Sequence, residues 1–152
     1  DIAHSRVARS NMIGLTKMGA KVAVAGPPSM LCVGLAEAYG VEVYTRPEEA
    51  IEGADAVMML RIQLERQSGG LFPGAREYAR VYGLTRDRLK LAKADAVILH
   101  PGPVNQGVEL PPELYEDERS VIWPQVTNGV AVRMALLYLL IERPSADAAN
   151  AA

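Results

Sequence analysis

Asp95-Ala-Val-Ile-Leu99 is a short apolar run that ends in the proline-rich turn His100-Pro-Gly-Pro103. A second run, Asp55-Ala-Val-Met-Met-Leu60, ends in Arg61-Ile-Gln63. Strands that are apolar at successive positions are typical of parallel sheets, in which helices cover both faces. The two runs therefore predict two buried strands of an α/β fold.

Outward from these runs, the sequence alternates between helical and extended patterns. Ser5 is the expected N-cap of the first helix, and Gly40 is the expected C′ residue of the second. Alternating strands and helices imply an open, mostly parallel, Rossmann-like sheet with helices on both faces. Further strands are expected over 21–25 and 41–44, and helices over 5–18, 29–39, 47–52, 75–82, 86–92, 111–117 and 125–142.

Composition excludes several classes of protein. The length of 152 residues predicts one domain, and a net charge of −2 gives no indication of a nucleic-acid partner or an anionic membrane surface. Cys32 is the single cysteine, which excludes an internal disulfide and a cysteine-built metal site and fits a cytoplasmic location. Its apolar neighbours predict that Cys32 lies in the core. The apolar segment 129–141 is too short to cross about 30 Å of hydrocarbon, so no membrane span is expected.

The candidate site is expected beyond the carboxyl ends of the strands, where open α/β sheets bind ligands. Residues i and i+2 of an extended backbone point to the same side, so Arg61 and Gln63 are expected to face one cleft. The prolines of His100-Pro-Gly-Pro103 lack N–H groups, so this turn presents carbonyl oxygens in a stiff geometry. Arg6 lies at the start of the first helix. Two guanidinium groups in one cleft favour a dianionic ligand, either a small dicarboxylate or a phosphate.

These residues also have structural interpretations. An arginine at a strand end, such as Arg61, is more often a surface salt-bridge partner, and His100 before a proline is more often a hydrogen-bonded structural residue. Arg6 is unfavourable for the helix macrodipole, which favours an anion nearby. His4 and His100 are the only histidines, so a histidine-rich metal site is excluded. The residues alone predict anion binding and no reaction.

Five motifs follow one another along the chain. They are Asp1-Ile-Ala-His-Ser-Arg-Val-Ala-Arg-Ser-Asn11, Met59-Leu-Arg-Ile-Gln-Leu-Glu-Arg66, Gly69-Gly-Leu-Phe-Pro73 with Arg76-Glu-Tyr78, His100-Pro-Gly-Pro-Val-Asn105, and Gln125-Val-Thr-Asn-Gly-Val-Ala-Val-Arg-Met134. From Asp1 to about Arg143, the chain resembles the catalytic chain of the aspartate carbamoyltransferase family. The sister ornithine enzymes carry His-Cys-Leu-Pro in place of His-Pro-Gly-Pro and Ser-Met-Gly in place of Arg-x-Gln, so the aspartate branch is favoured.

The resemblance implies that residues 1–143 are the second, aspartate-binding domain of a two-domain enzyme and lack the first strand of their sheet. The first domain of the family binds carbamoyl phosphate through a Ser-Thr-Arg-Thr motif and makes the contacts of a homotrimer. The helix over 125–142 would pack on that domain, which accounts for its apolar character all round. Residues 144–152 are expected to be a disordered tail, and the start at Asp1 is expected to be a cut inside a longer protein.

By the same resemblance, Arg6 would bind the α-carboxylate of aspartate and Arg61 its β-carboxylate, with Gln63 in support. The backbone of Gly102 and Pro103 would contact carbamoyl phosphate and guide the attacking amine. The implied reaction is carbamoyl transfer from carbamoyl phosphate to L-aspartate in pyrimidine synthesis, with no metal, no cofactor and no side chain of this piece as catalyst. This piece alone is expected to be inactive.

Two departures and two alternatives stay open. Gln106 stands where the family commonly has arginine, and Trp123-Pro124 is unusual before Gln125. One alternative is an ornithine or related amino-acid carbamoyltransferase. The other is a non-catalytic domain that keeps the fold for assembly. Binding of regulatory chains or of a dihydroorotase partner is left undecided.

Overall fold

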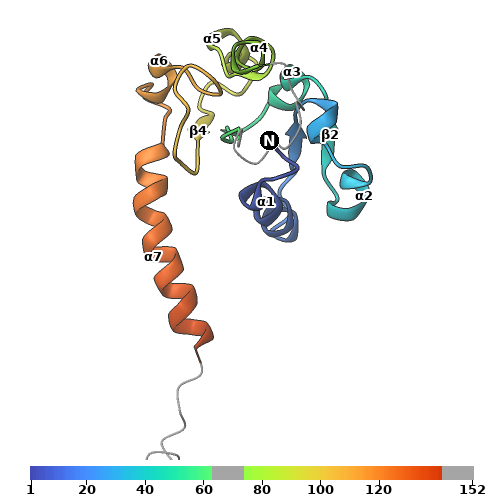
Figure 1. Ribbon diagram of the computed structural model, residues 1–152. Helices are drawn as coiled ribbons and strands as arrows, with labels where there is room; N and C mark the ends of the chain where they lie inside the picture. Colours follow the sequence, from blue (N-terminus) through green and yellow to red (C-terminus); the bar gives the residue numbers. More distant parts are fainter. Residues whose placement is uncertain (63–73, 142–152) are drawn as a thin grey trace, which may run out of the picture.

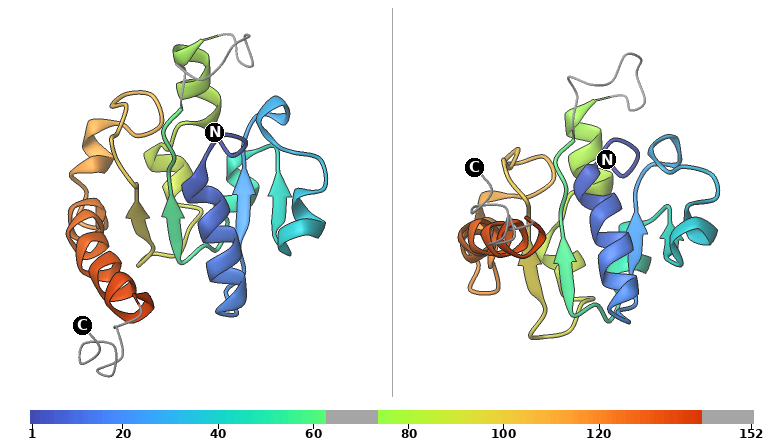
Figure 2. Two further views of the ribbon diagram at one scale, coloured as in Figure 1. Left: turned by 60° about the horizontal axis from the view of Figure 1, so that its bottom comes forward. Right: turned by 90° about the horizontal axis from the view of Figure 1, so that it is seen from below.

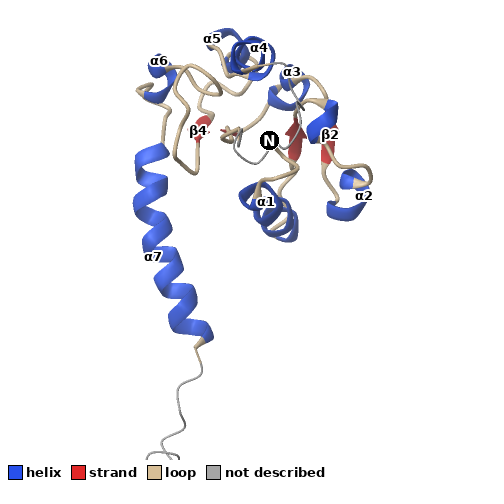
Figure 3. Ribbon diagram, in the orientation of Figure 1, coloured by secondary structure: helices blue, strands red, loops and turns tan. Residues whose placement is uncertain are grey.

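Short strands and helices alternate through the chain, as the sequence predicts (Figures 1 and 3). The computed structural model describes residues 1–62 and 74–141. In chain order its elements are α1 (Arg6–Lys17), β1 (Ala23–Ala25), the 3₁₀ helix η1 (Pro28–Met30), α2 (Leu35–Tyr39), β2 (Glu42–Tyr44), α3 (Pro47–Ile51), β3 (Ala56–Met58), α4 (Ala75–Tyr82), α5 (Arg86–Leu89), β4 (Val97–Leu99), α6 (Pro112–Tyr115) and α7 (Ile122–Leu140).

Capping residues set several of the helix ends. The Ser5 hydroxyl accepts a hydrogen bond from the Ala8 N–H and begins α1, which confirms the predicted N-cap. Thr85 begins α5 in the same way, by accepting from the Arg88 N–H. Gly40 ends α2 in the left-handed region at φ 66°, where glycine has no steric penalty.

The prediction of one helix over 29–39 is wrong for the first half of that range. The chain forms η1 and then turns at Gly34, whose φ of 78° cannot continue a right-handed helix, so α2 begins only at Leu35. Cys32 lies in this interruption and is exposed, which corrects its expected place in the core. Apolar neighbours in the sequence bury a residue only when the backbone turns it inward.

Two parallel strand pairs make up the sheet layer. β1 pairs with β2, with Val24 opposite Val43, and β3 pairs with β4, with Val57 opposite Ile98. Figure 2 shows β1 beside β3, with α1 crossing in front of them. Among the described residues, no ladder joins β1 to β3. The expected parallel layer with helices packed on it is therefore present as two halves.

The apolar core is divided in the same way. The larger cluster surrounds β3 and β4, and the smaller one surrounds β1 and β2. The Asn11 side chain of α1 reaches Sδ of Met58 in β3 at 3.4 Å, so α1 connects the two halves. The larger cluster contains Ile51, Val57, Leu84, Leu89, Ala92, Ala96, Ile98, Leu110, Leu114 and Ile122, and the smaller one Met12, Val24, Leu35 and Val41.

Helix α7 projects away from the rest of the structure (Figure 1). It begins three residues before the expected start, and its first residue, Ile122, is buried against the β4 side of the core. Farther along, apolar side chains are exposed around the helix, from Val130 at 57% to Leu140 at 78%. Within the described chain, α7 therefore carries a continuous series of exposed large apolar side chains.

Within the described residues, no helix combines the length and the apolar character that crossing a bilayer requires.

Candidate functional site

The predicted site residues that the structure describes lie at the edge of the sheet toward which the strands point. Figure 2 shows α1 starting at this edge, and Arg6 is its first residue, with an exposed side chain. Arg61 follows β3 and is half-buried, and Gly102 and Pro103 follow β4. Gln63 lies outside the described residues. The carboxyl edge of the sheet thus carries both arginines and the proline-rich turn.

Three contacts hold these segments next to one another. The Asn105 amide donates to the Ile62 carbonyl at 3.4 Å, which joins the turn after β4 to the residue beside Arg61. Ile62 packs with Met30 and Tyr78 in a small buried cluster. The Met30 carbonyl accepts from the Ala3 N–H at 3.0 Å, so the turn that precedes Arg6 joins the same assembly.

The turn over 100–105 uses its N–H groups internally. The His100 N–H donates to Oε1 of Gln125 at 2.9 Å, and the Gly102 N–H donates to Nδ1 of His100 at 2.9 Å. The peptide bond between Gly102 and Pro103 is cis. Within the described part of the chain, no donor reaches the carbonyl oxygens of Gly102 or Pro103. These carbonyl oxygens are able to accept hydrogen bonds from an N–H donor such as an amine.

His100 is fully buried and hydrogen-bonded, in agreement with its structural interpretation. Its Nε2 lies 3.2 Å from Oε1 of Glu109, a carboxylate that is also fully buried. Burial, reinforced by the nearby Glu109 carboxylate, raises the pKa of the Tyr78 phenol. Sequence reasoning missed Glu109. The signal that could have found it is an acidic residue between Val108 and Leu110, close behind the proline turn.

Asp1 is a second buried acid near this edge, at 4% exposure. Its Oδ1 accepts from the His4 N–H at 3.2 Å and lies 2.8 Å from Nδ1 of His4. The other oxygens of the two acids, Oδ2 of Asp1 and Oε2 of Glu109, are buried and find no hydrogen-bond partner among the residues that the structure describes.

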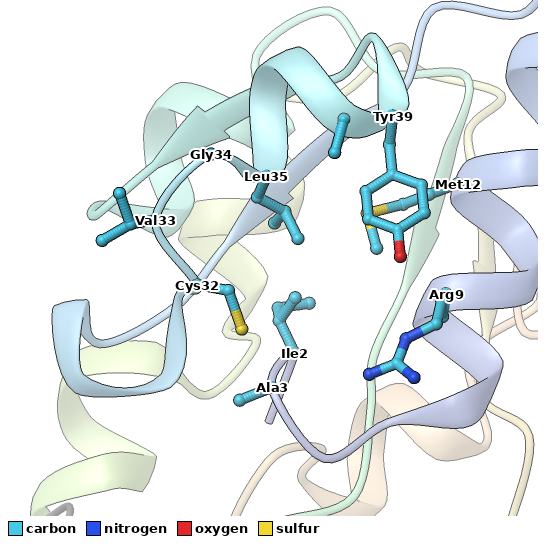
Figure 4. A pocket seen from close by; sticks show the side chains of 10 residues that line it. Ile2, Ala3, Arg9, Met12, Cys32, Val33, Gly34, Leu35 and Tyr39 are labelled. Carbon is cyan, nitrogen blue, oxygen red and sulfur yellow. The ribbon is translucent and has the colours of Figure 1, made fainter.

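A separate hollow of about 120 Å³ lies between the start of α1 and α2 (Figure 4). Arg9, Cys32 and Tyr39 line it among apolar side chains, and neither Arg6 nor Arg61 belongs to it. With Arg9 as its single cation, this hollow does not match a dianionic ligand. In the described ranges, no group of three His, Cys, Asp or Glu side chains is arranged to hold a metal ion.

Comparison with known proteins gives a consistent result. The family model described as aspartate/ornithine carbamoyltransferase, Asp/Orn binding domain, matches residues 1–140. The chain is 61% identical to the aspartate carbamoyltransferase catalytic subunit of Acetivibrio thermocellus over 150 residues, which are 99% of this chain and 48% of that protein. It is 62% identical to the subunit of the same name from Ruminiclostridium cellulolyticum over 143 residues, which are 94% of this chain and 45% of that protein.

Solved structures agree on the fold. The crystal structure of ornithine carbamoyltransferase from Thermus thermophilus matches with a TM-score of 0.75 at 25% identity, over 90% of this chain and 45% of that one. The chain spans about half the length of the curated relatives it matches.

Proposed function

The chain belongs to the aspartate/ornithine carbamoyltransferase family, and on that premise we propose that it is the aspartate-binding part of an aspartate carbamoyltransferase. The observation that carries this proposal is the placement of Arg6, Arg61 and the Gly102–Pro103 turn at one edge of the sheet. Two guanidinium groups suit a dicarboxylate, and carbonyl oxygens suit its amine.

In this proposal Arg6 binds the α-carboxylate of L-aspartate and Arg61 binds the β-carboxylate, with Gln63 in support. The amino group, in its neutral form, attacks the carbonyl carbon of carbamoyl phosphate and a C–N bond forms. Phosphate leaves with the electron pair of the C–O bond and takes up the proton that the amine nitrogen loses. The carbonyl oxygens of Gly102 and Pro103 accept N–H hydrogen bonds and hold the lone pair toward the carbon. Orientation and fixed dipoles lower the barrier.

The proposal places the groups that bind phosphate in a further domain of a longer protein. We propose that a carbamoyl-phosphate domain binds the phosphate, that α7 packs on that domain, and that the full-length enzyme is a cytoplasmic homotrimer. The domain would then comprise residues 1–143, followed by a tail. Exposed apolar surface on α7 supports this arrangement, because a helix that is apolar all round requires partners on several sides.

The first alternative is that the chain comes from an ornithine carbamoyltransferase. A solved structure that matches it at 25% identity carries that name. The side chain of ornithine is a cation, which Arg61 would repel. The test compares kcat/KM for L-aspartate and L-ornithine, with carbamoyl phosphate, in the full-length protein. We expect aspartate to be favoured by at least about 1,000-fold. A preference for ornithine would overturn the proposal, and no turnover with either would favour the non-catalytic alternative.

A second assay tests the division of labour between the domains. The isolated 152-residue chain should show no carbamoylation of aspartate, because the groups that bind phosphate lie elsewhere. Turnover by this chain alone would contradict that division.

A further inference from the structure

Glu109 is the buried anchor of the turn that carries Gly102 and Pro103. Its Oε1 accepts from the Asn105 N–H at 2.6 Å and lies 3.2 Å from Nε2 of His100. The two bonded groups lie at opposite ends of the turn, so one oxygen atom ties both ends together. The side chain is fully buried, which shields these bonds from competition by water.

The backbone of Glu109 is itself fixed from the other side. The Leu84 N–H donates to the Glu109 carbonyl at 3.0 Å. Gly83 packs so tightly beneath the Val108 carbonyl that a Cβ there would lie 2.6 Å from the oxygen. The backbone that carries the carboxylate is therefore held against the segment after α4.

The hydrogen bonds also assign the tautomer of His100. The Gly102 N–H donates to Nδ1, so Nδ1 carries a lone pair and the ring proton is on Nε2. Nε2–H then donates to Oε1 of Glu109. Were the proton on Nδ1, two donors would face each other at Gly102 and the turn would lose its internal bond. Glu109 thus selects the ring state that keeps the Gly102 N–H hydrogen-bonded within the turn.

We propose that Glu109 is a positioning residue for carbamoyl transfer, which acts through His100 and Asn105 to aim the Gly102 and Pro103 carbonyls at the substrate amine. This inference rests on the proposed function. The positioning role requires an acceptor oxygen at the end of a side chain as long as that of glutamate. The role does not require the negative charge.

Two variants of the full-length protein separate length from charge. In Glu109→Gln the amide oxygen replaces Oε1. The NH₂ group replaces Oε2, which makes no hydrogen bond with the described residues, so no bond is broken there. We expect its kcat to stay within about threefold of wild type. Glu109→Asp keeps the charge but withdraws the oxygen from the turn, and we expect kcat to fall by at least about tenfold. The KM for aspartate should stay within about threefold in both, since Arg6 and Arg61 are unchanged.

Glu116→Asp, at an exposed position after α6, is the matched control and should behave as wild type. Circular dichroism and thermal midpoints establish that each variant is folded. Loss of activity in Glu109→Gln with retention in Glu109→Asp would overturn the inference, as would wild-type kcat in Glu109→Asp. An inactive wild-type protein would instead refute the proposed function on which the inference rests.

Discussion

At the scale of single residues, Gly83 occupies a place that admits no side chain. A Cβ there would lie 2.5 Å from the Ala79 carbonyl oxygen and 2.6 Å from that of Val108. We expect Gly83→Ala to lower the free energy of unfolding by about 1–3 kcal/mol, because both neighbours are backbone atoms and cannot move aside cheaply. Urea unfolding measures the change.

Gly14→Ala is the matched control for that substitution. Gly14 lies in α1 with nothing within 4 Å of its Cβ position. Alanine there should raise the free energy of unfolding by about 0.5–1 kcal/mol through helix propensity. If both substitutions changed the free energy of unfolding equally, the close contact at Gly83 would not be the reason why that position excludes a side chain.

Arg88 joins three helices through its guanidinium group. Its Nε donates to Oε1 of Glu48 in α3 at 2.8 Å, and Nη2 donates to the Arg80 carbonyl in α4 at 3.3 Å. The side chain is 15% exposed. We expect Arg88→Gln to lower the free energy of unfolding by about 1–3 kcal/mol. Lys90→Gln, which breaks the fully exposed pair with Asp87, should change it by less than about 0.5 kcal/mol.

The contribution of the Arg88–Glu48 pair should depend on pH. The hydrogen bond from Arg88 lowers the pKa of the Glu48 carboxyl below its usual 4.5. A lowered carboxyl pKa stabilises the folded state above the unfolded value, and this stabilisation is lost as pH falls through the folded value. The difference in unfolding free energy between wild type and Arg88→Gln should therefore be full above about pH 5 and shrink on acidification. A difference that grows below pH 4.5 would contradict this assignment.

Residue types at strand ends predicted that Arg61 and the Gly102–Pro103 turn lie at the carboxyl edge of the sheet, while the ligand contacts of these residues stay predictions. They were insufficient for Glu109, whose burial depends on Leu84 and Gly83, far from it in sequence. A buried carboxylate is set by tertiary packing, and no local pattern encodes that packing.

At the scale of elements, α7 combines an anchored first turn with an exposed apolar remainder. Val130 and Leu137 are one heptad apart and are 57% and 55% exposed. The double substitution Val130→Gln with Leu137→Gln should change the unfolding free energy of the isolated chain by less than about 0.5 kcal/mol. In the full-length protein we expect a loss of at least about 2 kcal/mol, because the same side chains would be buried on the first domain. An unchanged full-length protein would remove the proposed packing role of α7.

Helices were predicted best where capping chemistry marks their ends. Ser5, the expected N-cap, begins α1 through a side-chain hydrogen bond, and serine is a residue type that marks helix starts in a sequence. The left-handed turn at Gly34 was missed, because a glycine in an apolar helical pattern does not reveal its φ. The strands are three residues each and shorter than their apolar runs, because ladder partners as well as apolar content define a strand.

At the scale of the whole molecule, the two strand pairs lie side by side, and no ladder within 1–62 and 74–141 joins β1 to β3. The Gly26 N–H donates to the Tyr44 carbonyl, so by alternation Ala25 directs its N–H away from β2, toward β3. The Met59 N–H donates to the Leu99 carbonyl, so Met58 directs its own N–H toward β1. The sequence predicted the parallel fold class, but not the division of the four strands of the described chain into two pairs.

We expect a strand of the longer protein to pair with both edges. The amides of Ala25 and Met58 should then exchange with solvent at least about 100-fold more slowly in the full-length protein than in the 152-residue chain. The Met59 amide, bonded within the β3–β4 pair at 2.9 Å, is the internal reference. Equally fast exchange of Ala25 and Met58 in both proteins would show that no strand fills the space between the pairs.

The central claim is that Arg61 recognises the side-chain carboxylate of the amino-acid substrate. The most direct test is the ratio of kcat/KM for L-aspartate to that for L-asparagine, measured in the full-length protein and in its Arg61→Gln variant. Asparagine has the same shape and lacks the charge. We predict that the ratio falls by at least about 100-fold in the variant. A ratio that is unchanged, with both substrates slowed equally, would contradict the assignment of Arg61 to this carboxylate.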